Sequence, residues 1–270
     1  MFNTIFDANG DASVNDKTVS RRRFLSTAGA GALAVAGLAA MSKKAEAHGS
    51  SHDQAIIQAA ATAEALATTM YFNIVNSSIY TDGLSTNAND QAYLVAGYEE
   101  ELDHYQLLSS VYPALATTFY FPTGMFGDPS TYRTTVNTLV TLEDAFIAAY
   151  LIGIRDLSSP GLKVLAGQIM GVESEHRAFG RVIAADLNLH STTGLSGTAE
   201  GVDGTSNFAA NNLSYERTFA GPGGLNQISD VVNALKPFLG VPTAGFSTTP
   251  YKLSDSLGLN ERIVLSNTTP

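Results

Sequence analysis

The chain has 270 residues, with 25 acidic and 15 basic side chains, a net charge of -10 and 44% hydrophobic residues. That content is enough for one sizeable core and too apolar for a disordered chain, and the acidity argues against nucleic acid as a partner because phosphates need a basic face. The chain has no cysteine, which excludes disulfides, thiolate metal sites and iron–sulfur centres and leaves oxygen and nitrogen as ligands for any metal.

The first 47 residues have the features of an export signal. Ser20 to Leu25 (SRRRFL) resembles the twin-arginine motif, and the weakly apolar run at 27–41 is shorter than the ~20 residues that span a bilayer as a helix. Ala45-Glu46-Ala47 is a small-x-small cleavage site, so we predict cleavage between Ala47 and His48. The mature protein would then be periplasmic or secreted, exported already folded and without a stable membrane anchor. A retained N-terminal anchor is the alternative.

Four long helices are predicted in the next domain, residues 48–190. Their composition is rich in Ala, Leu and Ile, and the last two begin with an N-cap residue followed by proline at the first helical position. Helices of this length are typical of bundles. The predicted ranges are Ser51 to about Asn76, Asn89 to Val111, Asp128-Pro129 to about Leu157, and Ser159-Pro160 to about Leu187.

The connections between these helices indicate a topology. The third and fourth helices are joined almost directly, so we expect them to be antiparallel neighbours. Residues 112–127, with a β-prone stretch at 117–121, are long enough to run the length of a bundle at ~3.3 Å per residue. One long crossover between two hairpins is the ferritin-like connection. We therefore predict an all-α, ferritin-like four-helix bundle; a different bundle with a surface loop at 112–127 is the alternative.

Residues 191–270 form a third predicted region, an extension rich in Gly, Ser and Thr. A loop as long as its first part is either a lid or disordered. Residues 225–239 have helical spacing of apolar side chains and predict a short helix that docks on the bundle. We expect the remainder to be mostly irregular.

Acidic residues and histidines recur near the middle of all four predicted helices. Two helices carry Glu-x-x-His, whose side chains lie one turn apart on one face, and the other two carry a single central Glu. Antiparallel helices of similar length bring their midpoints to one level, and this ligand set is the two-metal pattern of bundles. The predicted metal ligands are Glu64, Glu101, His104, Glu143, Glu173 and His176.

The charges of this set suit metal ions. Four carboxylates and two neutral imidazoles carry four negative charges, which two divalent cations cancel, whereas burying such carboxylates unpaired costs several kcal/mol each. Oxygen and imidazole ligands suit iron or manganese; zinc would be redox-inert. We expect Glu101 and Glu173 to bridge the ions, with Glu100 as the alternative to Glu101. A single Glu-x-x-His also arises by chance on exposed helices, so the pattern depends on all four helices together.

Two tyrosines stand at matching positions in the two hairpins. Tyr71 follows Glu64 by seven residues and Tyr150 follows Glu143 by seven, so each lies nearly two turns on along the face of its Glu. They are candidates for donating hydrogen bonds to the ligands or for electron transfer. The alternative is a core tyrosine whose hydroxyl is satisfied elsewhere.

The stretches at 141–150 (TLEDAFIAAY) and 172–176 (VESEH) resemble the bacterial ferritin-like domain proteins, including those called desiccation-related. The resemblance covers about residues 51–190, and the wider superfamily includes rubrerythrins, bacterioferritins, ferritins and manganese catalases. It implies a di-iron or di-manganese centre that handles O2 or peroxide. A cysteine-ligated rubredoxin module is impossible here, and the basic tails of DNA-protecting relatives are absent.

Three functions follow from these features. The leading hypothesis is an exported oxidoreductase whose di-metal centre reacts with peroxide or O2 in oxidative or desiccation stress. Iron binding or storage is the second, and a non-catalytic envelope stress protein on the same scaffold is the third. The expected partner is a small oxidant, and the chain is compatible with a homodimer.

Overall fold

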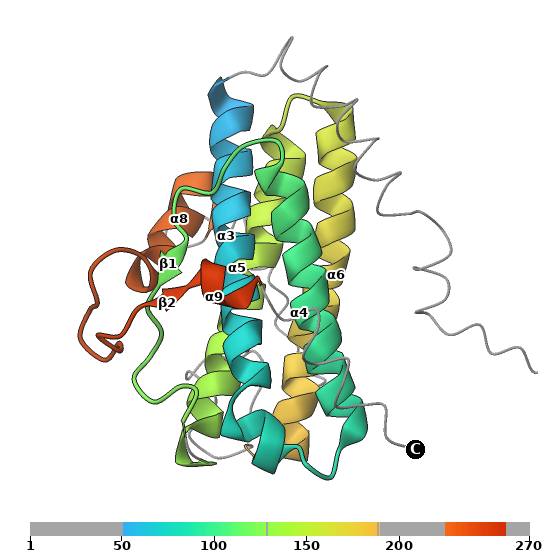
Figure 1. Cartoon of the computed structure of the whole chain (residues 1–270). Coiled ribbons are helices and arrows are strands. Elements are labelled where there is room, and N and C mark those ends of the chain that lie inside the picture. The colour runs from blue at the N-terminus through green and yellow to red at the C-terminus, as the bar shows by residue number, and fades with distance from the viewer. Residues whose placement is uncertain (1–50, 128, 188, 190–224, 258–270) are drawn as a thin grey trace, which may run out of the picture. The chain divides into compact units, whose positions relative to one another are not determined.

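The computed structural model describes residues 51–127, 129–187, 189 and 225–257, and four long helices dominate it (Figure 1). α3 packs against α4 and α5 against α6, and both α3–α5 and α4–α6 contacts join the two hairpins. The predicted all-α, ferritin-like bundle is confirmed, whereas the predicted export signal and all of residues 191–224 lie outside the described residues. The four helices are α3 (Ser51–Val75), α4 (Ala88–Ser109), α5 (Tyr132–Asp156) and α6 (Pro160–Asp186).

α3 is buried on all sides at its middle. Every residue from 61 to 71 is buried, and small alanines there allow neighbouring elements to approach closely. The helix contacts α4, α5 and three elements of the crossover and the C-terminal segment. A helix that is apolar all round belongs in the interior of a fold, which makes a charged side chain at its centre conspicuous.

The two hairpin turns are held by specific contacts. Between α3 and α4 the chain makes a π-helical turn (Ile79–Gly83), and Asn87 caps α4 by accepting a hydrogen bond from the backbone of Asp90 at 3.2 Å. Between α5 and α6, the backbone N–H of Ser158 donates to Asp53 at 2.9 Å, and its hydroxyl donates to the same carboxylate. This contact ties the start of α3 to the α5–α6 turn.

The starts of the last two long helices differ in detail from the predictions. Pro160 is the first residue of α6, as predicted, but Ser159 makes no side-chain cap. The predicted third helix begins with a 3-10 turn at Pro129–Thr131, and α5 starts at Tyr132. Asp128, the predicted cap, is not among the described residues. The 3-10 turn delays the α-helix by three residues and leaves its centre unchanged.

The crossover between the hairpins pairs with the C-terminal segment. β1 (Thr118–Phe119) lies antiparallel to β2 (Tyr251–Lys252), as Figure 1 shows beside α3. The backbone N–H of Leu253 donates to Thr117 at 3.0 Å, and that of Ser247 donates to Phe121 at 2.8 Å. The β-prone stretch of the crossover therefore forms a strand because a segment more than 100 residues later, in 225–257, offers it backbone partners.

The rest of the C-terminal segment is mostly irregular, as predicted. α8 (Ile228–Leu235) and a 3-10 turn (Lys236–Phe238) lie within the predicted short helix at 225–239, and α9 (Leu253–Ser256) follows β2. α8 packs on α3 and α5, and α9 packs on α3. The extension therefore covers the side of the bundle along which the crossover runs.

Among the described residues, one helix is long and apolar enough to cross a membrane. It is α5 with its preceding 3-10 turn, and 78% of its most apolar window is buried inside the protein. The middle of this helix carries the buried acids Glu143 and Asp144. Like α3, this helix is therefore a buried helix of the bundle.

Candidate metal centre

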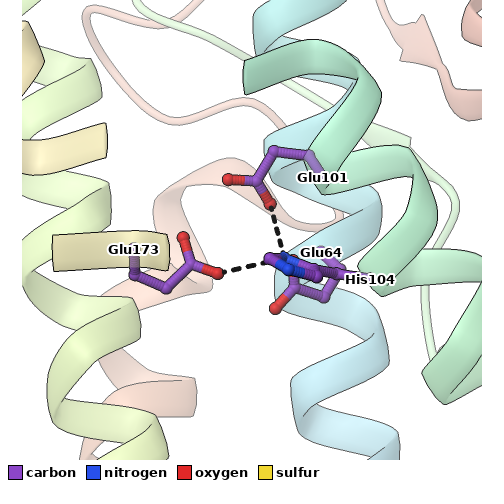
Figure 2. Close-up of side chains that lie close together, drawn as sticks. All are labelled: Glu64, Glu101, His104 and Glu173. Carbon is purple, nitrogen blue, oxygen red and sulfur yellow. Dashed lines mark ion pairs between the residues drawn. The ribbon is translucent and has the colours of Figure 1, made fainter. Parts of the chain in front are cut away.

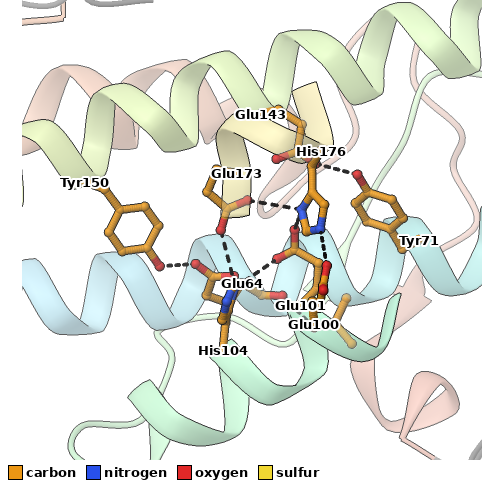
Figure 3. A network of polar contacts seen from close by, with 10 residues as sticks. Glu64, Tyr71, Glu100, Glu101, His104, Glu143, Tyr150, Glu173 and His176 are labelled. Atoms are coloured by element: carbon orange, nitrogen blue, oxygen red, sulfur yellow. Dashed lines mark hydrogen bonds and ion pairs between the residues drawn. The ribbon is translucent and has the colours of Figure 1, made fainter. Parts of the chain in front are cut away.

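The six predicted ligands meet in one layer at the centre of the bundle (Figures 2 and 3). α3 and α5 each provide one glutamate, and α4 and α6 each provide a glutamate and a histidine one turn later. All four glutamates are 0% exposed, His176 is 1% exposed and His104 is 9% exposed. Helical spacing places each Glu-x-x-His on one face, and the antiparallel packing brings the four faces to one level.

Within the described residues, two overlapping groups of side chains can each hold a metal ion. In each group the candidate ligand atoms lie within 4.8 Å of one another. Glu101 and Glu173 belong to both groups, which is the arrangement expected of bridging carboxylates. The first group is Glu64, Glu101, His104 and Glu173, and the second is Glu101, Glu143, Glu173 and His176.

Both imidazoles turn Nδ1 toward the carboxylates. The Nδ1 atom of His104 lies 3.3 Å from Glu173 and 3.5 Å from Glu64 (Figure 2). Nδ1 of His176 lies 2.8 Å from Glu101 and 3.5 Å from Glu173. Divalent cations bound among these atoms would therefore be ligated by Nδ1 of each histidine.

Several buried polar atoms of this cluster have no hydrogen-bond partner. Both oxygens of Glu173 are among them, as is Nδ1 of His104, whose contacts fall within ion-pair distance but outside hydrogen-bond geometry. Burying a carboxylate without such partners costs several kcal/mol, so the donor set fits cations bound between them. The remaining atoms are the Oε2 atoms of Glu64, Glu101 and Glu143.

Protons compensate for this charge when no metal is bound. Burial, assisted by the charge of Glu173, raises the pKa values of Glu101 and Glu143 well above their usual range. Burial alone would lower the pKa of His104, but Glu173 and Glu64 raise it to about 10. Burial would also raise the pKa of Glu173, yet the two histidines hold it below its usual value. Cations entering the cluster would therefore displace protons.

The two tyrosines hydrogen-bond to glutamates of the opposite hairpin (Figure 3). The hydroxyl of Tyr71 on α3 donates to Oε1 of Glu143 on α5 at 2.9 Å, and the hydroxyl of Tyr150 on α5 donates to Oε1 of Glu64 on α3. Burial raises the pKa of both phenols well above the usual value, and the charges of Glu143 and Glu64 add to the shift. Both hydroxyls therefore stay protonated, and each leaves Oε2 of its glutamate facing the cluster without a hydrogen bond.

Glu100 lies outside the cluster and contacts it through His176. Its side chain is 51% exposed, and Oε2 lies 2.9 Å from Nε2 of His176, on the opposite side of the ring from Glu101. A carboxylate that accepts the distal N–H of a ligating histidine fixes its tautomer and orientation. The structure thus turns Glu101 inward and makes Glu100 a partner of the ring. The spacing of the acids in the sequence does not reveal this role.

Gly97 is a further site residue that sequence analysis missed. It lies one turn before Glu101 on α4, and a Cβ atom there would lie 2.9 Å from the ring of Tyr71. The absence of a side chain therefore makes room for the tyrosine that hydrogen-bonds to Glu143. A glycine inside a predicted helix is a signal of such a close approach.

One glutamate from each of two helices and Glu-x-x-His from each of the other two is the ligand pattern found in metal-binding carboxylate bundles. Consistent with this pattern, residues 52–185 match the family model described as the ferritin-like domain. This part of the chain belongs to the ferritin-like superfamily, and it contains all six residues of the cluster. Searches of curated proteins and of solved structures returned no significant match.

Proposed function

We propose that this protein is an exported oxidoreductase in which two iron or manganese ions at the bundle centre react with O2 or peroxide during oxidative or desiccation stress. The observation that carries the proposal is the set of four fully buried glutamates with unsatisfied oxygens between two imidazoles. Two divalent cations neutralise these charges, and two overlapping ligand groups are available to hold them. Bound iron or manganese would supply the redox change that zinc lacks.

The overlap of the two groups supports an assignment of ligands. Glu64 and His104 would hold one ion, and Glu143 and His176 would hold the other. Glu101 and Glu173 would bridge them, because each belongs to both groups. Nδ1 would be the ligating nitrogen of both histidines, since it faces the carboxylates in each ring.

The surrounding residues would orient these ligands and exclude water. Tyr71 and Tyr150 each donate a hydrogen bond to one oxygen of a glutamate and so leave the other oxygen for a cation. Phe146 and Ile169, both buried, contribute an apolar layer next to the cluster. Fixed ligands and a dry surround are the protein's usual contributions to metal-ion chemistry.

Metal analysis of the purified protein tests the proposal. We expect close to two iron or manganese ions per chain after anaerobic loading, and at most one in Glu173→Ala, because this change removes a bridging ligand. Glu175→Ala is the matched control, since Glu175 is an exposed glutamate two residues away on α6. Loaded protein should consume O2 or peroxide, and unloaded protein should not. A protein that retains no redox metal after loading refutes the proposal.

Export is a separate part of the proposal, and it depends on residues 1–47. The resemblance of Ser20–Leu25 to the twin-arginine motif supports it, and this route would deliver a folded, metal-loaded protein. We expect a change of both Arg21 and Arg22 to Lys to retain the precursor in the cytoplasm. N-terminal sequencing of the exported protein should find His48 first; a chain that keeps its first 47 residues would favour the anchor.

A further inference from the structure

An apolar cavity of about 30 Å³, partly open to its surroundings, lies between the helices of the bundle beside the cluster. Leu108 on α4 lines the cavity four residues after His104, and Ile169 on α6 lines it four residues before Glu173. Four residues along a helix correspond to about one turn, or roughly 6 Å of rise. The cavity therefore occupies the layer of the bundle next to the ligands.

Tyr150 connects the cavity to the cluster. Its ring lines the cavity, and its hydroxyl donates to Glu64. All other lining side chains are apolar or belong to glycine. One of them, Ile228, comes from α8, so the C-terminal segment supplies part of the wall.

The lining determines which small molecule fits. A buried water needs two to four polar partners, and the single hydroxyl in this wall already donates to Glu64. Hydrogen peroxide carries two hydroxyl groups and would lose still more hydrogen bonds on entry. A volume of about 30 Å³ accommodates roughly two water-sized spheres, the dimensions of a diatomic molecule. An apolar diatomic gas needs no hydrogen-bond partner and is small enough for this volume.

We propose that this cavity binds dioxygen next to the carboxylate cluster, and that O2 rather than peroxide is the oxidant presented to the proposed metal centre. The choice of oxidant rests on the proposed function. The affinity of the cavity for an apolar gas does not rest on the proposed function, because this affinity depends only on the side chains that line the cavity. Binding in the cavity can therefore be tested independently of metal chemistry.

Xenon is the probe for the cavity, because it is apolar, close in size and visible by anomalous scattering. Crystals of the purified protein under xenon pressure should show xenon between Tyr150, Ile169 and Leu108. Ala166→Leu should abolish this site by filling it. Gly153→Ala should weaken it severalfold, since its new methyl would meet its neighbours at 3.7 to 4.0 Å without a clash.

Gly171→Ala is the matched control for Gly153→Ala, because it makes the same change in a long helix where no atom lies within 4 Å of the new methyl. Xenon binding should be unchanged in this control. Ordered waters in the cavity, or xenon occupancy equal in wild type and Ala166→Leu, would overturn the inference.

A kinetic comparison tests the choice of oxidant. In anaerobically Fe(II)-loaded protein, Gly153→Ala and Ala166→Leu should slow oxidation by O2 severalfold and leave oxidation by peroxide unchanged. Equal slowing with both oxidants would overturn the assignment of O2. If the wild type takes up xenon but binds no redox metal, the proposed function fails while the gas site stands.

Discussion

The Tyr71 hydroxyl on α3 donates a hydrogen bond at 2.9 Å to Glu143 on α5, so each hairpin helps to orient a ligand of the other. Tyr150 on α5 makes the reciprocal bond to Glu64 on α3. The pair relates the α3–α4 and α5–α6 hairpins by the pseudo-twofold symmetry that the repeated Glu and Tyr spacing indicates. The cluster is thereby coupled to the docking of the hairpins, and the effects of its residues on metal binding and on stability should appear together.

Tyr71→Phe should weaken metal binding about 10- to 100-fold, the usual effect of losing a hydrogen bond to a ligand. It should also lower the free energy of unfolding by about 1–3 kcal/mol, because Oε1 of Glu143 loses its buried partner. Competition titration with a chelator and denaturant unfolding measure the two effects. Tyr80→Phe, a change in the turn before α4, is the control; equal affinities in both variants would contradict the role given to Tyr71.

Glu100→Ala should reduce metal affinity by about 10-fold or more, since the ring of His176 loses the carboxylate at 2.9 Å. Glu100→Gln keeps an oxygen that accepts the Nε2 proton and should restore most of the affinity. A metal–imidazole spectroscopic band should shift in the alanine variant only. Glu99→Ala, at an exposed neighbouring position, should behave as wild type; if it matches Glu100→Ala, the effect is merely one of surface charge.

Removing the metal should make stability depend on pH. The folded metal-free protein holds protons on Glu101 and Glu143 above the usual carboxyl range, and on His104 up to a pKa of about 10. It therefore binds more protons than the unfolded chain, so its stability falls as pH rises toward 10. Melting temperatures with chelator should decrease from pH 6 to pH 9, and metal affinity should rise over the same range. A melting temperature that does not change with pH in the presence of chelator would contradict the raised pKa values of these buried groups.

Asp90→Asn should stabilise the protein above about pH 6. Burial, together with the charge of Asp186, raises the pKa of Asp90 to about 6. The cost of ionising Asp90 in this environment outweighs the favourable interaction of an acid with the first turn of α4. The raised pKa means that its ionisation opposes folding, and the penalty appears as pH rises between roughly 4 and 6. The variant should lose this part of the pH dependence of the melting temperature. Asp82→Asn, at an exposed position in the preceding turn, should retain it.

Gly97→Ala should destabilise the protein and weaken metal binding, although alanine favours helices by about 1 kcal/mol. The new methyl group would lie 2.9 Å from the ring of Tyr71, which is held by Glu143 and cannot retreat freely. Gly171→Ala makes the same change without a contact and should be neutral or stabilising. Thermal melting of the metal-free and loaded forms distinguishes the two variants. A Gly97→Ala protein as stable as Gly171→Ala would show that the ring adapts.

The sequence by itself determined the four helices and the level at which their acids and histidines meet. Helical spacing is a local property, so Glu-x-x-His lies on one face wherever the helix packs. The antiparallel arrangement follows from the short connections, and the midpoints then coincide. The composition also determines the class of ligand, carboxylate and imidazole without thiolate, because the chain has no cysteine.

The tertiary structure alone decided which atoms meet across helices. Local spacing placed Tyr71 on the face of Glu64, but the rotation of α3 against α5 directs its hydroxyl to Glu143. In the same way, the packing of α4 against α3 and α6 turns Glu101 inward and leaves Glu100 half-exposed behind His176. Pairing of the crossover strand with Tyr251–Lys252 and the position of the cavity also depend on contacts between distant segments. Such contacts arise from side-chain packing between elements, and the periodicity of a single element does not encode them.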